Sequence, residues 1–549
     1  MIFMYKLMNF YMHILSGIHK RYRLLLVCAY VLVLLPSWGQ VKVLNPQDYH
    51  HYIKAFNRND EELYKQSISN EEAWEFLSEN IPIFDCPDKQ LETTYYFRWW
   101  TFRKHIKKTK DGYIITEFLP QVGWSGKHNS INCPAGHHFY EGRWLKNPVY
   151  LKEYAEFWFK HGGNPRTYSF WAADAMNGFF KVHPDKQLIK SLLPDLDLNF
   201  KEWEKIRLDS TGLFWQIDNL DGMEVSVSGA LDKDHSGYRA TINSYMFGDA
   251  SAISEMARIT DQNLLAKFYN QRAGLIKTNI LKYLWDEEDK FFKVIPRGNP
   301  TMTKAKVREL HGFTPWYFSI PDEKHSTAWG QVRLPEGFYA PYGLTTTEQR
   351  NPGYQLAYEG HECQWNGPSW PFATSITLTG MINLLNNYNQ SVINSRDFID
   401  QLLIYSRSHV RKLDNGSLVP WIDENLNPYT GDWISRTRLK AWENGTWSVE
   451  KGGKERGKDY NHSTFCDLII SGLIGIRPGY EDSLVINPLI SAKEWDYFCL
   501  DQVKYHNKIL TIIYDKTGKK YYRGSGFQVL VDGVEKVKTT VPQKITIKL

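Results

Sequence analysis

Two segments of this 549-residue chain place carboxylates among aromatic side chains, a setting that tunes acids and bases for catalysis. The first, residues 213–229 (LFWQIDNLDGMEVSVSG), carries Asp218, Asp221 and Glu224. Burial beside Trp and Phe raises the pKa of a carboxyl group, and a general acid requires such a raised pKa. The alternative is structural: Asp218 or Asp221 caps the helix that follows.

The second segment, residues 420–433 (PWIDENLNPYTGDW), carries Glu424 shortly after Trp421 in a run of turn-forming residues. An inverting glycoside hydrolase needs a second carboxylate of this kind, which takes a proton from a water molecule on the far side of the sugar from the acid. The alternative is an exposed acidic turn. Together the two segments predict Asp221 as general acid and Glu424 as general base.

A third segment offers the groups that a sugar-binding subsite needs. Residues 360–372 (GHECQWNGPSWPF) combine Trp365 and Trp370 with the amides of Gln364 and Asn366. Aromatic rings stack on the apolar faces of sugars, and amides bind their hydroxyl groups. The alternative is a rigid Gly-Pro loop with buried tryptophans.

Two further loops, residues 137–144 (HHFYEGRW) and 169–174 (SFWAAD), are candidates for lining the same site. The His137–His138 pair lacks a spaced third ligand, so we predict no metal. The predicted substrate-binding residues are Trp215, Asp218, Arg143, Trp144, Trp171, Asp174, Gln364, Trp365, Asn366, Trp370 and Trp421.

The elements that must position these loops have helical periodicity. Apolar residues recur every three or four positions in residues 149–161, 245–259, 264–284 and 375–388, and loops rich in Trp, Asp, Gly, Asn or Pro follow. Helical hairpins with functional loops at one end predict a mainly α fold, an (α/α)₆ toroid of the six-hairpin glycosidase type. An open solenoid is the alternative, but no fixed repeat period supports it.

The domain boundaries follow changes in composition. After a helical lead-in at residues 40–93, we expect the toroid at residues 94–478. Residues 479–549 contain short runs rich in Val, Ile, Thr and Tyr, such as residues 509–514 and 527–531, separated by turn signals. This pattern predicts a small C-terminal β-sandwich.

Residues 1–39 resemble a signal peptide. A basic patch (Lys20, Arg21, Arg23) precedes an apolar run at residues 24–35, and small residues stand before Gln40. An uncleaved anchor is the alternative. Cleavage lowers the net charge from +5 to +1, because residues 1–39 contain four basic and no acidic side chains. We therefore expect an exported protein, periplasmic or extracellular, with no stable membrane insertion and no nucleic-acid partner.

Several motifs resemble those of the (α/α)₆ glycosidase clan that includes processing α-glucosidases, mannosylglycerate hydrolases and trehalases. Residues 424–431 (ENLNPYTG) resemble the clan's general-base motif, and residues 366–371 (NGPSWP) its Gly-Pro-x-Trp segment. Residues 461–468 stand where the closing helix of the barrel begins in these enzymes. The clan's acid motif is Gly-x-Asp followed by a polar run with Arg. Residues 219–222 (NLDG) match it in part and lack the Arg, which leaves the choice between Asp221 and Asp218 open.

The resemblance covers roughly residues 94–478 and implies α-linked substrates and inversion. With 20 Trp and 33 Tyr in the chain, we predict an exo-acting hydrolase of an oligo- or polysaccharide. It needs no cofactor, because water is the only co-substrate. The alternatives are a lyase with a Tyr or His base, a phosphorylase with a phosphate site, and an exported glycan-binding protein.

Overall fold

A computed structural model describes residues 42–356, 363–413, 415–434, 445 and 452–549. The chain divides into two units, Met1–Lys42 and Val43–Leu549, and the second contains the helices and sheets given below. The predicted signal peptide and residues 360–362 of the third segment lie outside the described residues. None of the described helices is both long and apolar enough to cross a membrane.

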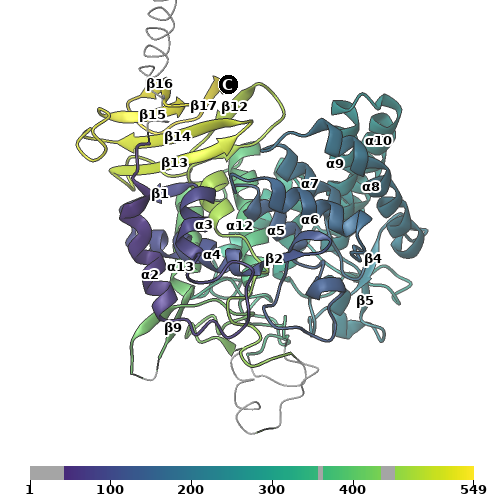
Figure 1. The fold of residues 1–549 in the computed structure, drawn as a ribbon. Coiled ribbons are helices and arrows are strands. Elements are labelled where there is room, and N and C mark those ends of the chain that lie inside the picture. Colours follow the sequence, from purple (N-terminus) through teal and green to yellow (C-terminus); the bar gives the residue numbers. More distant parts are fainter. Residues whose placement is uncertain (1–41, 357–362, 414, 435–444, 446–451) are drawn as a thin grey trace, which may run out of the picture. The chain divides into compact units, whose positions relative to one another are not determined.

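Two concentric layers of helices form the body of this unit (Figure 1). Along the inner layer, consecutive helices pack against one another: α5 (Ala135–Gly142), α7 (Ala172–Phe180), α9 (Ala240–Ile259), α11 (Thr314–Tyr317), α12 (Pro371–Asn387) and the π-helix η10 (Leu468–Leu473). The outer layer comprises α4 (Lys89–His105), α6 (Val149–Lys160), α8 (Lys186–Arg207), α10 (Asn263–Asn279) and α13 (Ser395–Ser408). This arrangement is the (α/α)₆ toroid, so the predicted fold class is confirmed.

The helices form where the apolar periodicity predicts them. In α6 the apolar face buries residues such as Leu151, Tyr154 and Trp158, and residues of α7, which belongs to the inner layer, are almost all buried. Side-chain caps set several starts: Asp88 accepts a hydrogen bond from the backbone N–H of Leu91 at 2.9 Å, and Asp185 from that of Leu188 at 3.0 Å.

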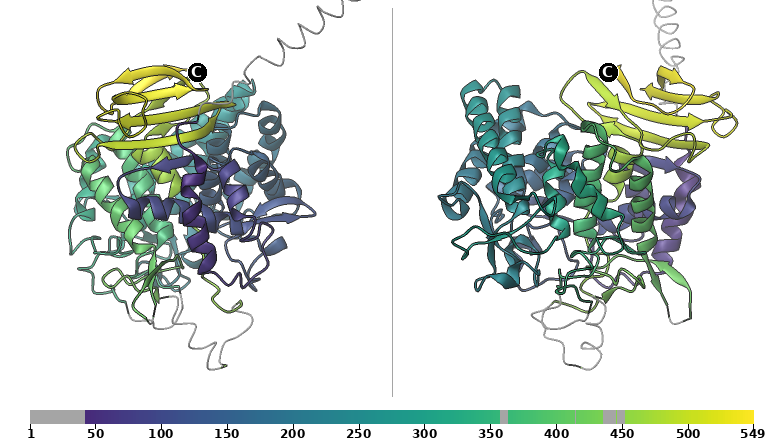
Figure 2. Two further views of the ribbon diagram at one scale, coloured as in Figure 1. Left: turned by 60° about the vertical axis from the view of Figure 1, so that its left-hand side comes forward. Right: turned by 180° about the vertical axis from the view of Figure 1, so that it is seen from behind.

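The C-terminal region forms two antiparallel sheets, as the short alternating runs predict. One has the strand order β1-β13-β14-β15-β16 and the other β11-β12-β17. The strands are β1 (Ile83–Asp85), β11 (Ile476–Arg477), β12 (Ser483–Ile486), β13 (Tyr497–Tyr505), β14 (Lys508–Asp515), β15 (Gly526–Val531), β16 (Val534–Thr539) and β17 (Ile545–Lys548). Figure 2 shows the yellow C-terminal strands at the same end of the helices in both views.

The lead-in is tied to this C-terminal region. It contains α2 (His50–Arg58) and α3 (Ala73–Asn80), and then β1, which pairs with β13 so that Ile83 lies opposite Asp501. The Asp501 carboxylate also accepts the backbone N–H groups of Val43 and Leu44 at 2.8 and 2.9 Å. The first strand of the larger sheet therefore comes from a part of the chain more than 400 positions before its partner.

Short hairpins complete the loops that connect the helices. The largest follows α4 and pairs β2 (Ile106–Thr109) with β3 (Gly112–Ile115), and another pairs β9 (Val410–Lys412) with β10 (Leu418–Pro420). A small sheet joins β4 (Trp215–Ile217), β5 (Ser236–Tyr238) and β8 (Ile295–Pro296) around the first carboxylate-bearing segment. These hairpins position the loops in which the candidate catalytic residues lie.

Candidate active site

A cavity of about 440 Å³ lies at the N-terminal ends of the inner helices. Cys133 precedes α5, Tyr168 precedes α7, Phe372 lies in the first turn of α12, and His462 precedes the last inner helix; all four line the cavity. The C-terminal sheets begin just beyond the opposite, C-terminal end of η10. Functional loops are therefore gathered at one end of the toroid, as the sequence predicts.

Three carboxyl side chains line this cavity: Glu117, Glu224 and Glu424. Arg456 is the only Lys or Arg among the lining residues that the structure describes. The aromatic members of the lining are Phe118, Trp124, Tyr168, Trp365, Trp370, Phe372 and Tyr460. Carboxyl groups surrounded by aromatic rings provide acid–base chemistry and stacking surfaces in one place.

Glu424 is buried, with 1% of its surface exposed. Its Oε1 pairs with Nη2 of Arg456 at 3.4 Å, and its Oε2 lies 3.8 Å from the Sγ of Cys363. Two backbone hydrogen bonds of 3.0 Å between Leu426 and Ser369 join its loop to the third segment. The predicted base and the predicted sugar-binding loop are therefore adjacent.

Glu224 reaches the same cavity from the first segment. Gly222 and Val225 on either side have φ of 74° and 58°, left-handed values that turn the chain sharply around this residue. The carbonyl of Glu224 accepts the backbone N–H of Trp365 at 3.1 Å. Glu224 is partly exposed, because its side chain faces the cavity. Burial by the surrounding protein, followed by the charges of Glu424 and Asp218, raises the pKa of its carboxyl group to about 8.

Asp221, the predicted acid, is not one of the lining residues. Its carboxylate is buried, pairs with Nε of Arg239 at 2.9 Å and accepts a short hydrogen bond from Thr241. Asp218 also lies outside the lining and accepts the backbone N–H of Asn219 at 2.7 Å, which is the capping role weighed above. A signal for Glu224 is present in the sequence, because Gly222-Met-Glu224 fits the clan's Gly-x-acid spacing with Glu in place of Asp.

Of the predicted substrate-binding residues, Trp365 and Trp370 line the cavity. Their rings stack on each other, with centroids 4.5 Å apart and 17° between the planes. Gln364 and Asn366 flank them without being part of the lining; the carbonyl of Gln364 accepts the indole N–H of Trp370 at 2.7 Å. The third segment therefore contributes aromatic rings to the cavity.

The remaining predicted residues lie elsewhere. Arg143 and Trp144 both donate to Oδ1 of Asp467, each at 2.7 Å. The ring of Trp171 packs against His137 and Tyr245, and Asp174 accepts a hydrogen bond from the hydroxyl of Tyr140. The guanidinium groups of Arg207 and Arg297 lie over the ring of Trp215, and that of Arg411 lies over the ring of Trp421. These residues are outside the cavity lining.

Sequence reasoning missed several lining residues, above all Glu117, Trp124, Arg456 and Tyr460. Trp124 keeps 40% of its surface exposed, and the guanidinium of Arg456 lies 5.0 Å from its ring. The available signals were weak: Trp124 lies in a Gly-rich stretch, and Tyr460 directly precedes the motif at residues 461–468.

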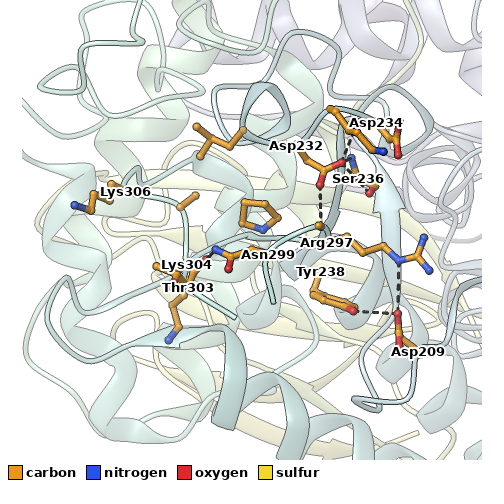
Figure 3. Close-up of a pocket in the computed structure, with 15 residues that line it drawn as sticks. Asp209, Asp232, Asp234, Ser236, Tyr238, Arg297, Asn299, Thr303, Lys304 and Lys306 are labelled. Carbon is orange, nitrogen blue, oxygen red and sulfur yellow. Dashed lines mark hydrogen bonds and ion pairs between the residues drawn. The ribbon is translucent and has the colours of Figure 1, made fainter. Parts of the chain in front are cut away.

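A larger depression of about 900 Å³ lies on another part of the protein, around β5 and β8 (Figure 3). Its carboxylates maintain local structure: Asp232 accepts the backbone N–H of Gly298 at 2.8 Å, and Asp209 accepts the hydroxyl of Tyr238 at 3.0 Å. None of the residues that line it belongs to the three motif segments. Within the described ranges, no cluster of three or more His, Cys, Asp or Glu residues could hold a metal ion.

Comparison with known proteins identifies the group to which these features belong. The family model of the mannosylglycerate hydrolase MGH1-like glycoside hydrolase domain matches residues 127–463, which is more than half of the chain. The chain belongs to this glycoside hydrolase family.

Solved structures agree with the fold. A structure named sialidase is 40% identical, with a TM-score of 0.83 over 92% of this chain. This chain spans only 45% of the length of that protein. The GH78 family rhamnosidase of Bacillus sp. GL1 is 10% identical, with a TM-score of 0.51 over 82% of this chain and 41% of its own, and it supports the fold alone.

Proposed function

We propose that this protein is a glycosidase, an inverting, exo-acting hydrolase of neutral, α-linked sugars, with Glu224 as general acid and Glu424 as general base. The observation that carries the proposal is that both carboxyl groups line one cavity of about 440 Å³ together with stacked tryptophans. The α linkage and the inversion rest on the resemblance of residues 424–431 to the base motif of the clan.

The surroundings of the two carboxyl groups support these roles. Burial and the neighbouring charges raise the pKa of Glu224 to about 8, so the group carries a proton at neutral pH and can donate it. Glu424 has the guanidinium of Arg456 at 3.4 Å, and a cation at this distance favours the ionised carboxylate that a base requires.

In the proposed reaction, the carboxyl group of Glu224 protonates the glycosidic oxygen as the C–O bond breaks. Glu424 removes a proton from a water molecule, whose oxygen attacks the anomeric carbon from the opposite face. The products are an alcohol and a free sugar of inverted anomeric configuration. The next catalytic cycle requires a proton to return from Glu424 to Glu224 through solvent.

The size and charge of the cavity favour the substrate class. A volume of about 440 Å³ is in the range of small-ligand sites and suits a terminal sugar unit better than the middle of a polymer. With pKa values of about 8, Glu117 and Glu224 are protonated at neutral pH, and Arg456, the only Lys or Arg among the described lining residues, is already paired with Glu424. These described lining residues therefore offer no unpaired cation to a sugar acid or a phosphate ion. This argument favours hydrolysis of a neutral sugar over phosphorolysis or release of an acidic sugar.

The test compares Glu224→Gln and Glu424→Gln with Asp218→Asn, a neighbouring acid outside the lining that serves as matched control. Activity is measured on α-linked oligosaccharides and on glycosyl fluorides, whose leaving group needs no proton. We expect both Gln variants to lose at least about 1,000-fold in kcat on oligosaccharides, within the range of general acid–base effects. Only Glu224→Gln should recover on fluorides, and Asp218→Asn should stay near the wild type.

The anomer formed first, followed by proton NMR on the wild-type protein, tests inversion directly. A first product with retained configuration would contradict the assignment of Glu424 as base. Full activity of Glu224→Gln on oligosaccharides, with loss of activity in Asp221→Asn at unchanged stability, would return the acid role to Asp221.

A further inference from the structure

The hydrolysis scheme uses two of the three carboxyl groups in the cavity and leaves Glu117 without a role. Glu117 follows β3, and its position is set by the segment before the last inner helix. The backbone N–H of Asn461 donates to the carbonyl of Glu117 at 3.2 Å, and the Asn461 side-chain amide donates to the carbonyl of Thr116 at 3.2 Å. The residue is therefore held firmly at the wall of the cavity.

Only one oxygen of the Glu117 carboxyl group has a partner within the described part of the chain. The hydroxyl of Tyr460 donates to Oε1 in a short hydrogen bond, whereas Oε2 has no hydrogen-bond partner there. The residue is 94% buried, because 6% of its surface is exposed, and it lines the cavity. An oxygen without a protein partner at the wall of an open cavity can form a hydrogen bond with a ligand in that cavity.

The chemistry of this oxygen depends on its protonation. Burial, followed by the nearby charges of Glu424 and Glu224, raises the pKa of Glu117 to about 8, although the Tyr460 hydrogen bond opposes the shift. At neutral pH the group is therefore a carboxylic acid. Because Tyr460 donates to Oε1, the proton resides on Oε2, which then offers a donor and an acceptor to a hydroxyl group.

We propose that Glu117 is a specificity-determining residue whose Oε2 binds one hydroxyl group of the sugar unit in the cavity, with Tyr460 holding the carboxyl group in position. The inference rests on the proposed function and adds to it a requirement on the substrate. The sugar must carry a free hydroxyl group at the position facing Glu117. A deoxy or O-methylated sugar at that position would leave Oε2 without this hydrogen-bond partner or would place a methyl group against it.

The experiment measures which hydroxyl group each variant recognises. The wild-type protein is first assayed on 4-nitrophenyl α-D-glucoside, α-D-mannoside, α-D-galactoside and α-L-rhamnoside. The monodeoxy derivatives of the best substrate are then compared in the wild type, Glu117→Ala and Glu117→Gln. Glutamine is neutral and has the shape of the protonated glutamate, so it serves as the matched control.

We expect the wild type to discriminate against one monodeoxy derivative by about 10–100-fold in kcat/KM, the size of one hydrogen bond to a buried partner. In Glu117→Ala the discrimination in kcat/KM against this one derivative should fall to less than about 3-fold. The discrimination against the other monodeoxy derivatives should stay as in the wild type. Glu117→Gln keeps a hydrogen-bond donor facing the sugar, so it should keep more of the discrimination at that position than Glu117→Ala does. A purely structural role would change all derivatives equally.

Two results would overturn the inference. The first is an unchanged penalty at every deoxy position in Glu117→Ala. The second is a Glu117→Gln variant as inactive as Glu224→Gln, which would make Glu117 an acid or a base. If the wild type cleaves none of the four glycosides, the proposed function fails for these four sugars. The binding affinities of the wild type and Glu117→Ala for the four free sugars and their monodeoxy forms are then compared by tryptophan fluorescence. If the loss of affinity from each sugar to its monodeoxy form is the same in the wild type and in Glu117→Ala, the role of Glu117 is refuted.

Discussion

The raised pKa of Glu224 has a measurable effect on folding stability. The group has a pKa of about 8 in the folded protein, against an ordinary value of 4.5. A raised folded-state pKa contributes stability that is fully present below pH 4.5 and is lost as the pH rises through 8. Glutamine never ionises, so Glu224→Gln should lack this loss. The free energy of unfolding of the variant should therefore rise relative to the wild type by about 4 kcal/mol between pH 5 and pH 9.

Urea unfolding followed by tryptophan fluorescence at pH 5, 7 and 9 measures this difference, because the chain contains 20 tryptophans. The matched control is Asp515→Asn. Although burial alone would raise the pKa of Asp515, hydrogen bonds from the backbone N–H groups of Tyr521, Gly518 and Lys520 lower it below its ordinary value. A depressed pKa contributes stability that is lost only as the pH falls below the ordinary value of 3.8. Asp515→Asn should therefore be less stable than the wild type by a constant amount from pH 5 to pH 9, because backbone N–H groups do not titrate in this range.

A constant difference between Glu224→Gln and the wild type, like that expected of Asp515→Asn, would refute the reasoning. It would mean that Glu224 is already ionised in the folded protein at neutral pH. A carboxylate that is ionised at neutral pH cannot serve as the general acid, so the catalytic assignment would also have to be withdrawn.

Further expected outcomes separate cavity residues from core residues. Trp124→Ala should raise KM about 10-fold at unchanged melting temperature, since an exposed ring at the cavity loses stacking only, measured by kinetics and calorimetry. Trp171→Ala should lower the free energy of unfolding by about 3–5 kcal/mol in urea, because this ring is fully buried. Asp221→Asn should lower it by about 3–5 kcal/mol in the same assay, because it leaves Arg239 buried without its counter-charge. We also propose that the protein is exported; N-terminal sequencing of the mature protein should start at Gln40, and retention of residues 24–35 would indicate an anchor.

The helices and the C-terminal strands could be predicted because their signals are local. Residues 149–161 bury one face every three or four positions, and α6 spans Val149–Lys160. Runs such as residues 527–531 correspond to β15. By contrast, β1 joins the C-terminal sheet although it lies before the toroid, and a three-residue strand has no local pattern that reveals its distant partner.

The aromatic residues show a different limit of prediction. Trp171 and Trp365 both occur in loops that precede an inner helix, Trp171 directly before α7 and Trp365 six positions before α12. The structure buries Trp171 completely and lets Trp365 line the cavity. A tryptophan ring has the same composition whether it fills a core or receives a sugar, so the difference depends on the neighbours that folding places around it.

The sequence by itself predicted a helical toroid with loops rich in acids and aromatics, a base-like motif that contains Glu424, and a separate Gly-Pro-x-Trp segment. Tertiary structure decided which acid joins Glu424. Asp221 and Glu224 are three residues apart, but left-handed turns at Gly222 and Val225 send one side chain to Arg239 and the other into the cavity. It also decided the place of Glu117, because the bond that orients it comes from Tyr460, 343 positions along the chain. Contacts between such distant segments arise only when the toroid closes.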